Sequence, residues 1–322
     1  MSSIVVVGSA NLDLVVRQPR PAAPGETMYG TSFATGPGGK GLNQAVAAAR
    51  AGGDVAFIGC VGADGFGERL RVVLDDAGVD ASSVRILDGA GGPERAATGI
   101  AAISVTDDGE NSIVIVPGAN GDDELTPADR AAIAAADFLV VQLERPLGLV
   151  RAALTHARES GTRAVLTPAP AVPEARDLVP LADIVVPNEG EAALLAGAGD
   201  GGVDGGVDGE SSDPEASARA LSARAAGGDG TGLAVVTLGA RGAVVARGGE
   251  IVLHVQPRRV EAVDTTGAGD TFVGAFVAWL ARGAELAEAL DAATAAAAIA
   301  VTRPGAADSM PTRAEIEAAL AE

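Results

Sequence analysis

The sequence predicts an α/β protein in which helices flank a doubly wound, mostly parallel central sheet. Short β-branched runs such as residues 4–8 have the near-continuous apolar character of strands that are buried on both faces. From residue 126 onward such runs alternate with segments of 3.6-residue apolar period, as strands and helices do around a parallel sheet. A length of 322 residues suffices for this architecture, and we treat residues 1–322 as a single domain.

The N-terminal part contains further strands that do not fit this alternation. Strands are predicted at residues 14–18 and 26–35 around a proline-rich turn, and at 98–105 and 112–116 as a hairpin. Between them we expect a helix from about Lys40 to Gly52, a strand at 55–60 and a helix at 66–77. The segments 12–36 and 95–117 would form a small β-sheet apart from the main body, which makes them a candidate lid.

The C-terminal half supplies most of the strand–helix units. Thr126 and Pro127 start a helix, and Thr312 with Glu315 forms a capping box for the last one. Strands are predicted at residues 138–144, at 183–191 and up to Thr237, and helices at 269–282, 286–302 and 313–321.

Residues 197–213, GAGDGGVDGGVDGESSD, are of low complexity. The repeated GGVD suggests calcium binding, but the segment lacks the EF-hand spacing and the acid at loop position 12. We predict a flexible, acidic, glycine-rich surface insertion.

Composition excludes several classes of function. A net charge of -20, from 43 acidic and 23 basic residues, argues against binding to nucleic acid or to an anionic membrane. The single cysteine, Cys60, allows no disulfide framework, and His156 and His254 form no zinc or Ser-His-Asp pattern with it. The N-terminus lacks a signal-peptide pattern, and no apolar run is long enough to span a membrane. We expect a soluble cytoplasmic protein.

The stretch of residues 262–283 carries the strongest chemical signal. Phe272, Phe276 and Trp279 lie on one face of a predicted helix, in front of which stand three small residues, Gly267, Ala268 and Gly269. Their amides and the free N–H groups of the first helical turn make an anion site. Asp270 in that turn would act as general base beside this anion hole. The alternative is an aspartate that only caps the helix.

Two glycine-rich stretches near the N-terminus deliver polar side chains. Asn11 and Asp13 follow the first strand on one face of an extended chain, where they suit vicinal sugar hydroxyls or simply form a turn. Lys40, the only lysine in the chain, shares a helix face with Asn43 after Gly38 and Gly39, although the loop is not a Walker A motif. We interpret both side chains as ligand contacts. Further polar residues, Glu144, Asn188, Glu191 and Thr237, fall at the carboxyl ends of strands, where α/β sheets bind ligands.

Together, GGKGLNQA at residues 38–45 and DTTGAGDTFVGA at 264–275 resemble the two signatures of the ribokinase-like, PfkB-type carbohydrate kinases. The similarity is colinear over the whole chain, and GSANLD, PGET, QLERP, PNEGE, TLGARG and AAAIAVTRPGA are most similar to the members that act on ribose. The resemblance implies ATP-dependent phosphorylation of D-ribose to D-ribose 5-phosphate, with Asp270 as base and the 267–269 amides as anion hole.

The resemblance also assigns binding residues. Sugar contacts would be Asn11, Asp13, Gly39, Lys40, Asn43, Glu144 and Asp270. ATP contacts would be Asn188, Thr237, Leu238, Gly239, Ala240, Arg241, Gly242, Gly269 and Thr294, with Glu191 helping to position Mg²⁺ and the phosphates. A potassium ion would lie beside Asp264, Thr266, Ala300, Arg303, Gly305 and Ser309, several of them contributing backbone carbonyls. Family members often dimerise through the lid, so a homodimer is expected.

Thr167 departs from the family pattern, which often has Asn there, but it is not one of these assigned residues. Other functions stay open at this point. A kinase of the same family could act on deoxyribose, fructose or adenosine, although few aromatics are available to stack on a purine. A non-catalytic sensor would have lost the base or the anion hole. A nicotinamide-dependent dehydrogenase would need G-x-G-x-x-G after the first strand, and that motif is missing.

Overall fold

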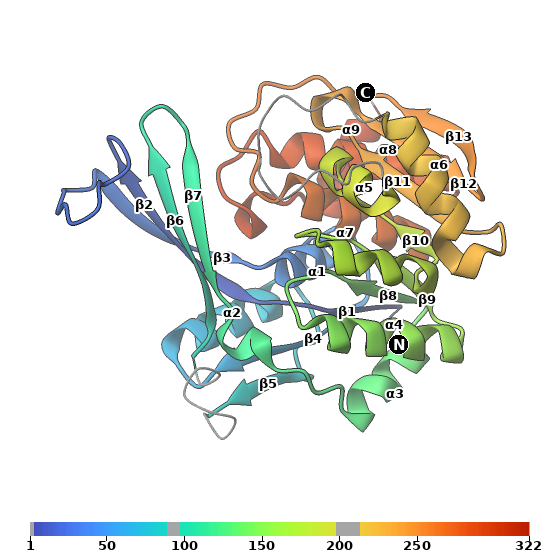
Figure 1. The fold of residues 1–322 in the computed structure, drawn as a ribbon, viewed down its shortest axis with the longest axis horizontal. Helices are drawn as coiled ribbons and strands as arrows, with labels where there is room; N and C mark the ends of the chain where they lie inside the picture. Colours follow the sequence, from blue (N-terminus) through green and yellow to red (C-terminus); the bar gives the residue numbers. More distant parts are fainter. Residues whose placement is uncertain (1–2, 89–96, 198–212, 322) are drawn as a thin grey trace.

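The computed structural model describes residues 3–88, 97–197 and 213–321, so most of the predicted insertion lies outside the described residues. Within them a nine-stranded central sheet has the order β13-β12-β11-β10-β9-β8-β1-β4-β5 (Figure 1). All neighbours from β5 to β11 are parallel, while β12 and β13 are antiparallel. The strands are β1 Ile4–Val7, β4 Val55–Gly62, β5 Val84–Leu87, β8 Phe138–Val141, β9 Arg163–Leu166, β10 Ile184–Val185, β11 Leu233–Thr237, β12 Ala243–Arg247 and β13 Glu250–Val255. The predicted fold class is confirmed.

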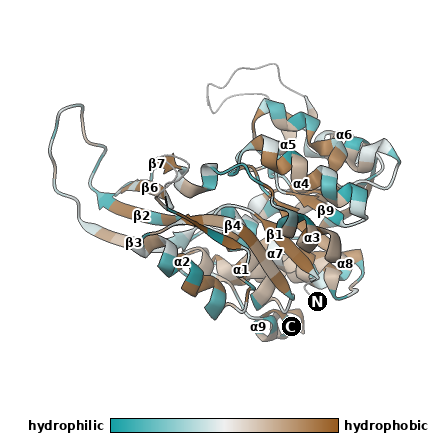
Figure 2. Cartoon of the chain, turned by 90° about the horizontal axis from the view of Figure 1, so that it is seen from below, coloured by the Kyte–Doolittle hydropathy of each residue, from teal (hydrophilic) through white to brown (hydrophobic). Residues whose placement is uncertain are grey.

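Helices cover both faces of this sheet, because successive residues of each buried strand point to opposite sides. In β1, Ile4 and Val6 join one core cluster and Val5 and Val7 join the other. Figure 2 shows the apolar character of β1 and β4 between the layers. The first cluster includes residues of α1 Lys40–Arg50, α2 Gly65–Asp76, α7 Ala268–Ala281, α8 Leu286–Ala300 and α9 Arg313–Leu320. The second includes residues of α3 Pro127–Ala135, α4 Leu147–Ser160, α5 Glu189–Ala196 and α6 Pro214–Arg224.

A second sheet of four strands projects from the main body (Figure 1). Its order is β3-β2-β6-β7, built from β2 Asn11–Gln18, β3 Ser32–Gly38, β6 Gly99–Thr106 and β7 Asn111–Val116. Asn11 starts β2 opposite Gly38 of β3 and Gly99 of β6, so the base of this sheet adjoins the end of β1.

Three predicted strands were too long. The strand predicted at 138–144 ends at Val141, so Gln142 and Glu144 lie beyond it. The strand predicted at 26–35 begins only at Ser32, because β2 ends at Gln18 and its residue Arg17 already pairs with Ser32. The Thr31 amide adds one hydrogen bond to the Arg17 carbonyl oxygen before β3 begins. The strand predicted at 183–191 ends at Val185, because the Asn188 side chain caps α5 instead. No helix among the described residues is both long and apolar enough to cross a bilayer.

Helices α1 and α7 pack closely at Gly274. A Cβ atom added there would lie 2.5 Å from the Ala47 Cβ atom and 2.7 Å from the backbone nitrogen of Ala48. Both contacts belong to α1, so the helices would have to move apart to make room.

We therefore expect Gly274→Ala to lower the free energy of unfolding by about 1–3 kcal/mol, the usual cost of overpacking. Urea denaturation measures this loss. The matched control is Gly65→Ala in α2, where an added Cβ atom has open space. It should change stability by less than about 0.5 kcal/mol. Equal effects of the two substitutions would contradict the close packing of α1 on α7.

Candidate active site

The N-terminus of α7 opens on a glycine in a left-handed conformation. Gly267 is the N-cap residue with φ 74°, a value that only glycine adopts at little cost. The amide of Ala268 donates to the Thr265 carbonyl oxygen over 3.2 Å. The amides of Gly269 and Asp270 follow in the first turn, where an α-helix offers no backbone acceptor. These free N–H groups and the helix dipole make this end of α7 suited to an anion.

Asp270 is buried at this helix end, and its carboxylate is held from α1. Asn43 Nδ2 donates to Oδ2 over 3.1 Å, and Gln44 Nε2 donates to Oδ1 over 2.9 Å. Both of these hydrogen bonds come from α1 and neither comes from the helix α7 that carries Asp270. Burial raises the pKa of Asp270, while the Lys40 charge and the two amide donors oppose the rise. A buried carboxylate with a raised pKa is a better proton acceptor than an exposed one.

Further predicted sugar contacts lie at the junction of β1, β2 and α1, and among them Asn43, Lys40 and Glu144 interact with Asp270. Glu144, just after β8, accepts through Oε2 from the Lys40 backbone amide over 2.9 Å and from the Ser9 hydroxyl over 2.5 Å. Asn43 Oδ1 is buried and has no hydrogen-bond partner among the described residues, so it is a free acceptor. Gly39, with φ 89°, lies against the backbone of Asn11.

The charges of the site are coupled. Burial lowers the pKa of Lys40, but Asp270, Glu144 and Glu191 outweigh that effect and leave the pKa above its ordinary value. Burial and the nearby Glu144 raise the pKa of Asp13 to about 6. The site therefore keeps one firmly charged ammonium group among several carboxylates, of which Asp13 titrates near neutrality.

The predicted nucleotide contacts lie at the carboxyl ends of β10 and β11. Asn188 and Glu191 form a reciprocal capping box at the start of α5, with both hydrogen bonds 2.8 Å long. Asn188 pairs with Thr237 in a parallel bridge, and Arg241 forms an ion pair with Glu189. The remaining predicted residues here are Leu238, Gly239, Ala240 and Gly242, in the turn between β11 and β12. Thr294 lies on α8, where its hydroxyl donates to the Leu290 carbonyl oxygen over 2.8 Å.

The predicted cation residues come from the segment before α7, from the end of α8 and from the segment after it. The Asp264 carboxylate accepts from the backbone amides of Thr266 and Gly305, both over 2.9 Å. Burial raises the pKa of Asp264, but these hydrogen bonds outweigh it and hold the pKa below its ordinary value. Of the further predicted residues, Ala300 is the last residue of α8, and Arg303 and Ser309 lie in the segment that follows it. The Arg303 side chain donates to Glu315, so only its backbone is available to a cation.

Sequence reasoning missed several polar residues of the site. Ser9 and Gln44 lie inside the motifs GSANLD and GGKGLNQA, and Gln142 lies inside QLERP. Asn120 Nδ2 donates to Asn11 Oδ1 over 2.8 Å and so orients that predicted sugar contact. The available signal was a polar residue in an otherwise apolar run, as in FLVVQLE.

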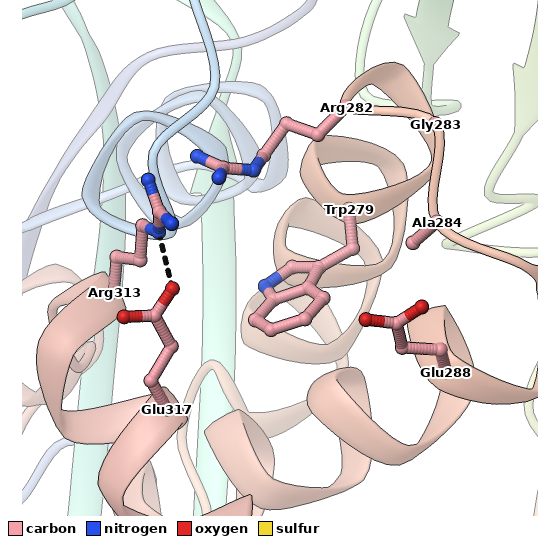
Figure 3. A pocket seen from close by; sticks show the side chains of 7 residues that line it. All are labelled: Trp279, Arg282, Gly283, Ala284, Glu288, Arg313 and Glu317. Atoms are coloured by element: carbon pink, nitrogen blue, oxygen red, sulfur yellow. Dashed lines mark hydrogen bonds and ion pairs between the residues drawn. The ribbon is translucent and has the colours of Figure 1, made fainter.

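A pocket of about 340 Å³ lies elsewhere, between the end of α7 and α9 (Figure 3). Arg313 pairs with Glu317 there, and Arg282 and Glu288 also line it. With as many carboxylates as guanidinium groups, this pocket favours neither anions nor cations, and none of the predicted site residues lines it.

Comparison with known proteins identifies the family of this chain. The model of the pfkB family of carbohydrate kinases matches residues 1–313. The chain belongs to this family. A curated relative, the ribokinase of Haemophilus influenzae, is 39% identical over 315 residues, covering 97% of this chain and 96% of the relative.

Two solved structures share the fold of this family member. The ribokinase of Thermotoga maritima has a TM-score of 0.86 at 32% identity, with 100% of both chains covered. The Arabidopsis thaliana ribokinase, complexed with ribose and ATP, has a TM-score of 0.87 at 31% identity, covering 99% of this chain and 98% of that one. The family and its fold, as expected from the two motifs, are thus confirmed.

Proposed function

We propose that this pfkB-family protein transfers the γ-phosphoryl group of ATP to D-ribose and forms D-ribose 5-phosphate and ADP. The observation that carries the proposal is a buried carboxylate, Asp270, at a helix N-terminus with free amides, surrounded by Lys40, Asn43 and Glu144. Ribokinase relatives, one of them complexed with ribose and ATP, support the choice of substrates.

In the reaction, Asp270 takes the proton of the sugar 5-hydroxyl group as its oxygen attacks the γ-phosphorus. The bond between the γ-phosphorus and the β–γ bridging oxygen breaks, and ADP leaves with that electron pair. The first-turn amides of α7, including that of Gly269, hold the charge on the transferred phosphoryl group. Ala268 would not donate to the phosphoryl group, since its amide already donates to the Thr265 carbonyl oxygen.

The sugar hydroxyls would meet both donors and acceptors. Lys40 donates, Asp13 and Glu144 accept, and Asn43 offers the free Oδ1 acceptor. Asn11 and Gly39 complete this set at the base of the small sheet, which we propose acts as the lid over the sugar. The outer apolar residues of that sheet would pack against a second copy of the chain. They are Phe33, Ile113, Val114, Ile115 and Val116, all exposed here.

ATP would lie along the ends of β10 and β11, against Asn188, the 237–242 turn, Gly269 and Thr294. No group of three or more His, Cys, Asp or Glu side chains among the described residues is arranged to hold a metal ion. We propose that Mg²⁺ would be held mainly by phosphate oxygens and water, as is usual in kinase sites. Glu191 would help to place it, and magnesium would neutralise phosphate charge.

We further propose that potassium activates the enzyme from a site beside Asp264. The ionised carboxylate and the backbone carbonyls of Thr266, Ala300, Arg303 and Gly305, together with Ser309, are oxygen donors that suit a monovalent cation. We expect the turnover rate to be higher in potassium chloride than in sodium chloride at equal ionic strength. Equal rates in the two salts would contradict this site.

The pH dependence of sugar binding follows from Asp13. Its pKa of about 6 means that the carboxylate gains a proton as the pH falls through that value, and it then loses acceptor capacity. We expect KM for ribose to rise as the pH falls from 7 to 5, and to be flat between 7 and 8. In Asp13→Asn the rise below pH 6 should disappear. A rise that persists in this variant would assign the titration to another group.

The experiment that tests the proposed function is ADP release with MgATP in potassium buffer, across ribose, deoxyribose, fructose, adenosine and no sugar. We expect the largest kcat/KM with ribose. A larger value with another member of this panel would keep the chemistry and change the substrate. ADP release that no member stimulates would favour a sensor on the kinase fold.

A further inference from the structure

Two buried glutamines form a chain of hydrogen bonds that ends on Asp270. Gln142 Nε2 donates to Gln44 Oε1 over 2.7 Å, and Gln44 Nε2 donates to Asp270 Oδ1 over 2.9 Å. Both glutamines are 1% exposed. We propose that Gln44 is a positioning residue that orients the Asp270 carboxylate toward the sugar hydroxyl, and that Gln142 acts through Gln44. This inference rests on the proposed function.

The chemistry of Asp270 fixes the direction of the chain. A carboxylate only accepts hydrogen bonds, so Gln44 must turn its NH₂ group toward Asp270. The Gln44 carbonyl oxygen then faces Gln142, which in turn must present its own NH₂ group. If Gln44 were reversed, two oxygens would face each other at Asp270. Gln142 opposes this reversal, because its NH₂ group would then face the NH₂ group of the reversed Gln44 instead of the Gln44 carbonyl oxygen.

The far end of the chain supports a role beyond packing. Gln142 Oε1 is buried and has no hydrogen-bond partner among the described residues, and it lies against the backbone at Gly8. An unpartnered buried carbonyl is costly. A methionine at position 142 would fill a similar volume without leaving a buried carbonyl oxygen unpaired. We therefore infer that the role of Gln142 is the hydrogen bond from its NH₂ group to Gln44.

Both oxygens of Asp270 are fixed by neighbouring residues of α1. Asn43 donates to Oδ2 and Gln44 to Oδ1, so the plane of the carboxylate is set by the close packing of α1 on α7. One amide per oxygen leaves each oxygen a further lone pair for the substrate proton.

The amide donors also set the proton affinity of the base. Asp270 faces the charges of Lys40, Glu144 and Glu191. Burial raises the pKa of Asp270, and the hydrogen bond from Gln44 counteracts it by stabilising the charged form. Without that bond the pKa lies higher. Because the base is active only when deprotonated, the acid limb of the activity profile then moves to higher pH.

The test uses Gln44→Met, Gln142→Met and the double variant. We expect Gln44→Met to lower kcat about tenfold and to raise the acid limb of kcat/KM by about one pH unit, the scale of one hydrogen bond to a charged group. KM for ribose should change less than about twofold, since the residues that bind the sugar equally in the ground state and the transition state are unchanged. Gln142→Met should act in the same direction with a smaller effect.

The double variant decides whether Gln142 acts through Gln44. We expect its kcat to be no lower than that of Gln44→Met alone, because Gln142 has no Gln44 carbonyl oxygen left to orient once Gln44 is replaced. If the fold-losses of kcat in the two single variants multiplied in the double variant, the two glutamines would act independently and this coupling would be overturned. Thr162→Val is the matched structural control, since it removes a buried 2.8 Å hydrogen bond to Ile133 far from Asp270. It should lower the melting temperature without moving the pH profile.

A second readout needs no turnover. In protein labelled with ¹³C at aspartate Cγ, the Asp270 signal, assigned by its absence in Asp270→Asn, should titrate at a higher pH in Gln44→Met than in the wild type. An unchanged titration would overturn the proposed role of Gln44. A wild type that is inactive on ribose yet shows this shift would contradict the proposed function and leave the positioning role supported.

Discussion

Asp270→Asn is expected to lower kcat by about 10²-fold or more, the usual scale for losing a general base. The substitution keeps the shape of the side chain between Asn43 and Gln44, but an amide cannot take the proton of the sugar hydroxyl. KM for ribose and for ATP should change far less than kcat, because the groups that bind them remain. Steady-state kinetics at saturating ATP measures this difference.

The matched control is Asp129→Asn. Asp129 is also a buried aspartate, but it belongs to the capping box of α3 and accepts from the Thr126 amide. Its loss should lower the melting temperature and leave kcat unchanged. Near-normal turnover in Asp270→Asn, or an equal loss in Asp129→Asn, would remove Asp270 from the role of base.

Glu144→Gln is expected to raise KM for ribose about 10- to 100-fold, the range for a hydrogen bond to a charged group. Glu144 also holds Ser9 and the Lys40 amide, so its charge fixes the geometry between β1 and α1. A second effect is specific to the charge. Because Glu144 helps to raise the pKa of Asp13, the pH at which KM begins to rise should fall below about 6 in this variant.

Glu250→Gln serves as the control. Glu250 is an exposed residue of the remote edge strand β13, and it forms an ion pair with Arg219 of α6. It should leave both KM and its pH dependence unchanged. An acid limb that stays at the same pH in Glu144→Gln would show that Asp13 and Glu144 do not interact as described.

Local patterns predicted the fold well. Helix α7 was predicted at 269–282 and runs over Ala268–Ala281. Its bounds could be predicted because the apolar stripe and the glycine that ends the helix, Gly283, are both local features of the sequence. The prediction failed where two local rules competed. Val186 and Pro187 continue an apolar run, yet Asn188 and Glu191 carry a capping-box pattern, and the cap determined the outcome.

The contacts within the site were beyond local reasoning. Asn43 and Asp270 are 227 positions apart, and they meet only because Gly274 lets α1 approach α7. Gln44 lay inside a recognised motif, but nothing in its neighbours indicates that it faces Asp270 rather than the core. Such pairings depend on helix packing, which a single sequence does not contain.

The most direct test of the proposed chemistry is ³¹P NMR of the wild-type reaction with ribose and MgATP. The γ-phosphate signal of ATP should be replaced by one phosphate ester that couples to the two C5 protons of ribose, in equal amount to ADP. Inorganic phosphate alone, or an ester at another carbon, would contradict transfer to the 5-hydroxyl group by Asp270.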